Sequence, residues 1–227
     1  VVEDLGPLLG QNYRLTEGFA ELVLSDFIQR KALSGPAIAA LNTQLAETQN
    51  TSRTVRQSTL IFRLRTADPY RCFIPCLAGA EPQIRTYLGK HLGPTQAYAD
   101  VILARSEKLT PPAEALVLQQ RAIAHLRSLN PNTLTFAQRG SVARRLSDLQ
   151  LANPEGCDQA CEQAALRVLV GDLGQEKDAT LGFAGRVLEA IQSGNRLQSN
   201  DFAIGKRVGV ADLILAPRSR QTVELGS

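Results

Sequence analysis

Apolar side chains recur every three or four residues along most of this chain, which is the period of a helix with one buried face. In segment 54–66, the residues spaced along this face end with Phe62 and either Arg63 or Thr66. In segment 96–108, the corresponding face runs from Tyr98 to Arg105. A strand at 58–64 is the alternative for the first segment, and we prefer the helix. Helices are predicted at 19–30, from the Gly35-Pro36 pair onward, and at 54–66, 82–91, 96–108, 113–129, from Thr135 onward, and at 161–173, 181–193 and 199–215.

Prolines and glycines divide these helices into larger parts. Residues 1–15 contain Gly6-Pro7 and show little periodicity, so we expect an extended N-terminal arm. The best internal boundary is Thr110-Pro111-Pro112, because threonine caps helices and proline is tolerated in a first helical turn. The predicted organisation is an arm at 1–15, helical modules at 16–109 and 110–215, and a C-terminal tail at 216–227.

Two stretches of the chain, 67–76 and 152–161, share prolines and cysteines at a constant offset. An internal duplication of a unit of about 85 residues is the simplest explanation, and it predicts an all-α protein of two tandem related helical modules. The residue pairs that lie 85 positions apart are Pro69 and Pro154, Cys72 and Cys157, and Cys76 and Cys161.

Composition supports packed helices. Hydrophobic residues make up 44% of the chain, which is enough for a core, yet aromatic residues are only 5% and Trp is absent. Such a core consists mainly of Leu, Ala, Val and Ile, which suits helices better than a β-sandwich.

The net charge of +3 indicates a mildly basic surface. Arginine binds carboxylates through paired hydrogen bonds, so we expect protein partners with acidic surfaces. The chain lacks the clustered basic stripe of a nucleic-acid binder, and no apolar run is long enough to span a membrane. The candidate partner-binding residues are Arg14, Arg144, Arg145, Arg218 and Arg220.

The four cysteines, Cys72, Cys76, Cys157 and Cys161, by themselves suggest two kinds of chemistry. Two close pairs favour disulfides and hence an oxidising compartment. We favour pairing within each stretch, while pairing between the stretches stays open. A zinc site is the second possibility, since four thiolates can bind zinc tetrahedrally. Three residues between the cysteines of each pair, rather than two, argue against a redox catalyst.

No catalytic constellation is evident. His91 and His125 are the only histidines, and neither has a nearby cysteine or carboxylate pattern that suggests catalysis. The sequence contains no Gly-x-Ser-x-Gly elbow and no dinucleotide-binding fingerprint. We therefore expect a protein that is not an enzyme and has no catalytic residues and no metal.

Residues 54–94 contain three short motifs, which are Thr54-Val55-Arg56, Tyr70-Arg71 and Lys90-His91-Leu92-Gly93-Pro94. They are similar to motifs of phycobilisome linker domains, which contain a Thr-Val-Arg start, a Tyr-Arg pair and a Lys-His-Leu segment. Residues 19–45 contain Phe27-Ile28-Gln29-Arg30, with Gly35 five residues after the arginine. This part resembles helical repeats of exported bacterial surface proteins, in which an apolar helix and an arginine precede a glycine by five residues.

The first resemblance implies a non-enzymatic scaffold or linker subunit of a photosynthetic assembly, located in a plastid or on thylakoids. It also implies a possible pigment attached covalently to a cysteine, although no other cofactor is expected. The alternatives are an exported, disulfide-stabilised surface or periplasmic interaction protein, and a pigment- or metal-carrying protein that uses the cysteine pairs.

Overall fold

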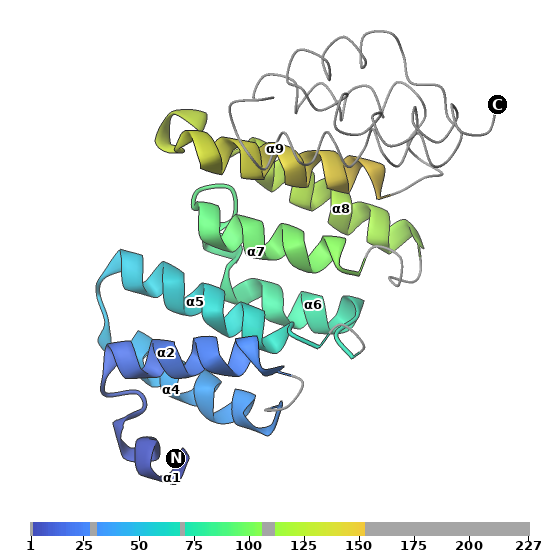
Figure 1. Cartoon of the computed structure of the whole chain (residues 1–227). Coiled ribbons are helices and arrows are strands. Elements are labelled where there is room, and N and C mark those ends of the chain that lie inside the picture. The colour runs from blue at the N-terminus through green and yellow to red at the C-terminus, as the bar shows by residue number, and fades with distance from the viewer. Residues whose placement is uncertain (1, 28–30, 69–70, 106–111, 153–227) are drawn as a thin grey trace, which may run out of the picture. The chain divides into compact units, whose positions relative to one another are not determined.

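A computed structural model describes residues 2–27, 31–68, 71–105 and 112–152, and every regular element in these ranges is a helix (Figure 1). The all-α fold class is thus confirmed for this part of the chain. The chain divides into two compact units, Val1–Leu129 and Asn130–Ser227. The module boundary expected at 109/110 lies inside the first unit. The helices predicted at 161–173, 181–193 and 199–215 lie outside the described residues.

The elements of the first unit include both α-helices and 3-10 turns. They are α1 (Val2–Leu5), η1 (Gly6–Leu8), α2 (Tyr13–Ser25), η2 (Lys31–Leu33), α4 (Ser34–Glu47), α5 (Thr51–Arg65), α6 (Ile74–Ala80), η3 (Glu81–Gln83), η4 (Arg85–Tyr87), α7 (Leu92–Leu103) and α8 (Pro112–Arg127). The second unit contributes η5 (Pro131–Thr133) and α9 (Phe136–Leu151).

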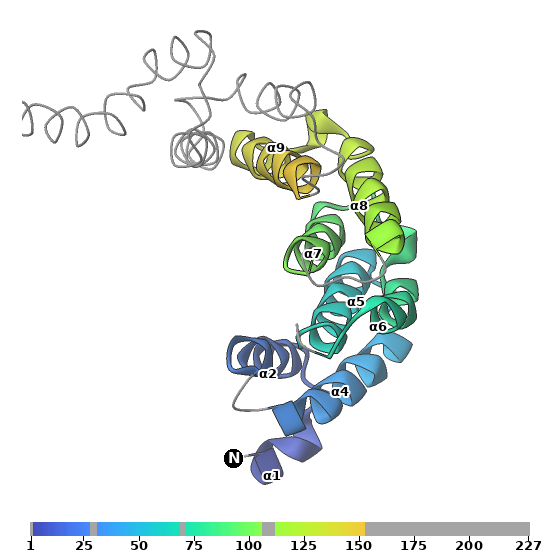
Figure 2. The same ribbon diagram turned by 90° about the vertical axis from the view of Figure 1, so that its right-hand side faces the viewer.

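The helices of the first unit form two layers. In one layer α2 packs against α5, and α5 packs against α7. In the other layer lie α4, which packs against α2 and α5, and α8, which packs against α7; α6 lies on the same side (Figure 2). Between α2, α4 and α5 is a core of aliphatic and aromatic side chains: Phe19, Ala20, Val23, Ala37, Leu41, Leu60, Ile61 and Leu64.

Polar side chains fix the starts of the main helices. The Asn12 side chain accepts a hydrogen bond from the backbone N–H of Leu15, and that of Asn50 accepts one from Arg53. Each asparagine thereby satisfies a backbone donor that has no partner within its helix. Thr135 forms a reciprocal capping box at the start of α9.

Two segments differ from their predictions. Residues 1–15 contain α1, η1 and the start of α2, so α2 begins at Tyr13 behind the Asn12 cap instead of near Phe19. No α-helix spans 82–91; the 3-10 turns η3 and η4 occupy half of this segment. Ile84 and Leu88 are buried there, and their four-residue spacing imitates a helix.

The turns that precede α2 and α7 have the same hydrogen bonds at an offset of 79 residues. The backbone N–H of Gly10 donates to Thr16 Oγ1 at 2.8 Å, and that of Gly89 donates to Thr95 Oγ1 at 2.9 Å. Each threonine hydroxyl donates in turn to the carbonyl four residues earlier. Both glycines have a positive φ, 91° for Gly10 and 74° for Gly89, which is a backbone region that residues other than glycine rarely adopt.

Helices α5 and α9 correspond at the offset of 85 residues. Their cap residues Asn50 and Thr135 lie 85 positions apart. The second cysteine pair lies outside the described residues, so the duplication stays a prediction. The positions buried in both helices are Gln57, Ser58, Phe62 and Leu64 in α5, and Val142, Ala143, Ser147 and Leu149 in α9.

Candidate functional site

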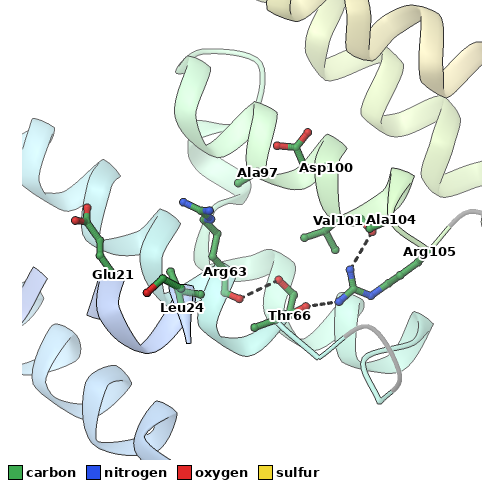
Figure 3. A pocket seen from close by; sticks show the side chains of 11 residues that line it. Glu21, Leu24, Arg63, Thr66, Ala97, Asp100, Val101, Ala104 and Arg105 are labelled. Atoms are coloured by element: carbon green, nitrogen blue, oxygen red, sulfur yellow. Dashed lines mark hydrogen bonds between the residues drawn. The ribbon is translucent and has the colours of Figure 1, made fainter. Parts of the chain in front are cut away.

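A surface pocket of about 580 Å³ opens between α2, α5 and α7 (Figure 3). Its volume lies in the range of about 300–1,000 Å³ that is usual for ligand sites. Several lining residues are exposed, so the pocket faces solvent. The lining is Glu21, Leu24 and Ser25 from α2, Arg63, Thr66 and Ala67 from α5 and the residues after it, and Ala97, Asp100, Val101, Ala104 and Arg105 from α7 and the residues after it.

Two arginines of α5 are held against α2 beside the pocket. The Arg53 guanidinium lies 4.3 Å from the centre of the Tyr13 ring. Arg56 pairs with Glu17 at 3.1 Å and with Glu21 at 2.9 Å, and the hydrogen bond to Glu21 raises the pKa of Arg56. The carboxylate of Glu17 is almost fully buried, so this ion pair joins the two helices at their core edge.

Arg63 lies further along the same face of α5, inside the pocket. It is exposed, and its guanidinium makes no hydrogen bond or ion pair within the described residues. Neither Glu21 nor Asp100, the two carboxylates of the lining, pairs with it there. The pocket therefore contains a cation with unused donors.

Arg105 closes the end of the pocket where α5 ends, and its role differs from that of Arg63. It is only 3% exposed. Its guanidinium donates to the backbone carbonyls of Thr66, of Cys72 at 2.8 Å, of Asp68 at 3.3 Å and of Val101 at 3.0 Å. Burial lowers the pKa of Arg105, and the charge of Asp68 opposes that shift. Arg105 thus fixes the segment between α5 and α6, because four hydrogen bonds of its guanidinium go to backbone carbonyls.

A second group of titratable side chains lies where η3, α7 and α8 meet. The buried carboxylate of Glu81 pairs with Arg85 at 3.2 Å and with Arg121 at 3.0 Å. Burial, with the charge of Glu81, raises the pKa of Tyr98 to about 12. The Tyr98 ring meets the ring of His125 edge-on at 6.0 Å, and burial lowers the pKa of His125. Because Glu81 is already paired with two arginines, this group joins helices and offers no accessible acid.

The hydroxyl groups of the pocket are engaged with their own helices. Ser25 Oγ donates to the carbonyl of Leu22, and Thr66 Oγ1 donates to that of Phe62. Neither histidine lines the pocket. What the pocket offers is a guanidinium beside small apolar side chains, an arrangement suited to binding a carboxylate.

The first cysteine pair forms a disulfide. Cys72 and Cys76 are bonded, with their Cα atoms 5.0 Å apart, and the bridge links the segment after α5 to α6. Local pairing, the expectation for this pair, is what the structure contains. Both sulfur atoms are consumed, so neither can hold a metal or a thioether-linked pigment in this state. Cys157 and Cys161 lie outside the described residues.

Of the five arginines predicted to bind partners, three lie in the described part of the chain. Arg14 is exposed on α2 and forms no ion pair in the described part of the chain. On α9, Arg144 pairs with Asp148 at 3.8 Å, and Arg145 donates to the carbonyl and the hydroxyl of Ser141. Arg218 and Arg220 lie outside the described residues.

Sequence reasoning missed Arg63 and Arg105 as site residues, although a signal existed for Arg105. It occupies the buried face that begins at Tyr98, and a charged residue in an apolar stripe needs internal partners. Arg63 was also placed at the end of a predicted stripe, but it is exposed, and its lack of a partner within the described residues depends on which residues α2 places opposite it.

No protein-family model matches the sequence, and no curated protein or solved structure shows significant similarity to it. Among the described residues, no helix is long and apolar enough to cross a membrane. The same part of the chain contains no group of three or more His, Cys, Asp or Glu side chains placed to hold a metal ion.

Proposed function

We propose that this protein is a non-enzymatic helical scaffold that holds protein subunits in a larger assembly. The observation that carries the proposal is the open pocket between α2, α5 and α7, which presents Arg63, an arginine without a partner in the described part of the chain. An arginine with unused donors is suited to a carboxylate on another protein. The exposed Arg14 and the net charge of +3 agree with partners that have acidic surfaces.

The resemblance of residues 54–94 to phycobilisome linker domains supports a photosynthetic assembly in a plastid or on thylakoids. That part of the proposal rests on the short motifs alone. Internal duplication belongs to the same proposal, and the shared turns before α2 and α7 and the shared cap positions of α5 and α9 support it.

The direct test is to isolate the chain in its native state. Native electrophoresis followed by mass spectrometry should find it in a band together with at least one other protein, and that band should dissociate at high salt, because exposed ion pairs are screened. A chain that migrates alone at every salt concentration contradicts the scaffold.

A second candidate, an exported interaction protein stabilised by disulfides, is favoured by the Cys72–Cys76 bridge. Disulfides persist in oxidising compartments and are rare in reducing ones. Thiol titration of the denatured native chain tests this candidate. With local pairing in both stretches we expect no free thiols, while four free thiols would contradict the bridge and export together.

A pigment-carrying protein is the third candidate. With Cys72 and Cys76 bonded to each other, an adduct would have to be on Cys157 or Cys161. Intact mass and an absorbance spectrum of the native chain would reveal it.

A further inference from the structure

The face that α5 turns toward α2 carries three arginines, and they differ in what α2 places opposite them. Tyr13 lies under Arg53, and Glu17 and Glu21 pair with Arg56. These contacts use the first two arginines to hold α2 and α5 together.

The third arginine has no such counterpart. Where Arg63 lies, α2 contributes Leu24 and Ser25 to the pocket, and the Ser25 hydroxyl donates its hydrogen bond to a carbonyl of its own helix. An arginine that only held the two helices together would be expected opposite an acid, as Arg56 is. Arg63 instead leaves its donors to solvent or to a bound group.

The walls around Arg63 favour a side chain with both apolar and acidic parts. Leu24, Ala97, Val101 and Ala104 line the pocket, and three of these are small or β-branched side chains that leave the space open. A guanidinium beside apolar surface binds a carboxylate more strongly than one fully in water, because the local dielectric constant is lower.

Arg63 sets how much negative charge the pocket can pair. Its guanidinium has no partner within the described residues, whereas Arg105, the other cation of the lining, makes four hydrogen bonds to backbone carbonyls. The pocket therefore offers one anchor for a carboxylate, which suits a single acidic residue with apolar neighbours.

We propose that the pocket between α2, α5 and α7 binds one aspartate or glutamate side chain of a partner protein, flanked by apolar residues, and that Arg63 is its carboxylate anchor. This inference rests on the proposed scaffold function and specifies how a partner is recognised.

The test begins with a phage-displayed library of random 12-residue peptides selected on the full chain. Peptides enriched on the wild type are synthesised with a fluorescent label. Their affinities are measured by fluorescence anisotropy for the wild type, Arg63→Gln and Arg65→Gln. Arg65 is the matched control: it is exposed on the same helix, it does not line the pocket, and its substitution removes the same charge.

The selected peptides should share one acidic residue between apolar ones. Arg63→Gln should weaken binding about tenfold, the effect of losing a charge-assisted hydrogen bond, while Arg65→Gln should change it less than about twofold. Replacing the peptide's acid by its amide should weaken binding to the wild type about tenfold as well, because it removes the other half of the same charge-assisted hydrogen bond. It should not weaken binding to Arg63→Gln further, because the two groups then act as one pair. Thermal denaturation of both variants checks that each stays folded.

Three results would overturn the inference: equal losses for Arg63→Gln and Arg65→Gln, additive losses for the arginine and the acid, or selected peptides without an acid. The scaffold function is judged separately on the native chain. If the peptide test fails but the native chain co-migrates with partner proteins, only the pocket proposal is rejected. If the peptide test succeeds but the native chain migrates alone, only the scaffold proposal is rejected.

Discussion

The turn before α2 and the turn before α7 have the same internal hydrogen bonds and different surroundings. Gly10 with Thr16, and Gly89 with Thr95, form the same contacts 79 residues apart. Around them the chain differs: α2 is followed by Asp26, whereas the corresponding position after α7 is Arg105. A local glycine and threonine pattern thus fixes the conformation of each turn. The residues packed around a turn determine how much its loss destabilises the rest of the unit.

Arg105, which follows α7, is the largest difference in the surroundings of the two turns, and its loss should have the largest effect. Arg105→Met leaves up to four buried or partly buried carbonyls without a donor, so we expect the free energy of unfolding to fall by about 4 kcal/mol. Arg127→Met, at an exposed position near the end of α8, should change it by about 0.5 kcal/mol or less. Urea denaturation measures both, and similar losses would show that the Arg105 contacts contribute little.

The glycines should respond unequally although both have positive φ. An alanine at either position costs about 1–2 kcal/mol for the backbone conformation alone. At Gly89 the new Cβ would also collide with the Ser128 hydroxyl, while at Gly10 its nearest neighbour is Thr43 Cβ at 3.2 Å. We expect Gly89→Ala to cost about 3 kcal/mol and Gly10→Ala about 1.5 kcal/mol. Equal losses of the free energy of unfolding, measured by urea denaturation, would contradict the difference in packing around the two glycines.

The threonines should respond equally, which is the sharpest check on the shared geometry. Thr16→Val and Thr95→Val each leave a buried glycine N–H without an acceptor, at a cost of about 1–2 kcal/mol. Valine has nearly the same shape, so packing changes little. A difference of more than about 1 kcal/mol between the two variants would show that the turns are not equivalent in energy.

The smallest effect concerns pH and arises where α7 and α8 pack together. His125 packs on Tyr98, near Glu81 and Arg121, whereas α2 has Phe19 at the position of Tyr98. Since burial lowers the pKa of His125 from 6.5, the unfolded chain binds the proton first. Stability should therefore fall as the pH falls below 6.5, and His125→Gln should reduce that fall. Thermal melts across this pH range, with His91→Gln as the comparison, measure it; an unchanged slope in His125→Gln would contradict the assignment.

The sequence predicted the helical class and several elements well. The predicted helix at 54–66 corresponds to α5 at Thr51–Arg65, and the one at 113–129 to α8 at Pro112–Arg127. The strand alternative at 58–64 is wrong. Both of these helices have a strong apolar period, and for such segments the pattern alone is sufficient.

Helix starts and the turns around Ile84 were predicted less well. Asn12 and Asn50 are ordinary helix caps that could have been recognised from their residue type. The 3-10 turns over 82–91 could not, because Ile84 and Leu88 are spaced as on a helix while Gly89 adopts a positive φ that ends the segment.

The candidate site was largely beyond sequence reasoning. Spacing favoured Cys76, four residues away, as the disulfide partner of Cys72, while pairing between the two stretches had stayed open. The carbonyls that bind Arg105 come mostly from residues 33 to 39 positions earlier, and only the packing of α7 on α5 brings them together. The difference between Arg56, which pairs with two glutamates of α2, and Arg63, which does not, becomes visible only when α2 is placed beside α5.

The central claim is that the layer formed by α2, α5 and α7 holds a partner. Hydrogen–deuterium exchange of the native assembly and of the chain alone tests it most directly. The account predicts that the assembly slows exchange in peptides that cover 21–25, 63–67 and 97–105, and that exchange in α4 is unchanged. Slower exchange confined to α4, or no difference between the two samples, would contradict the claim.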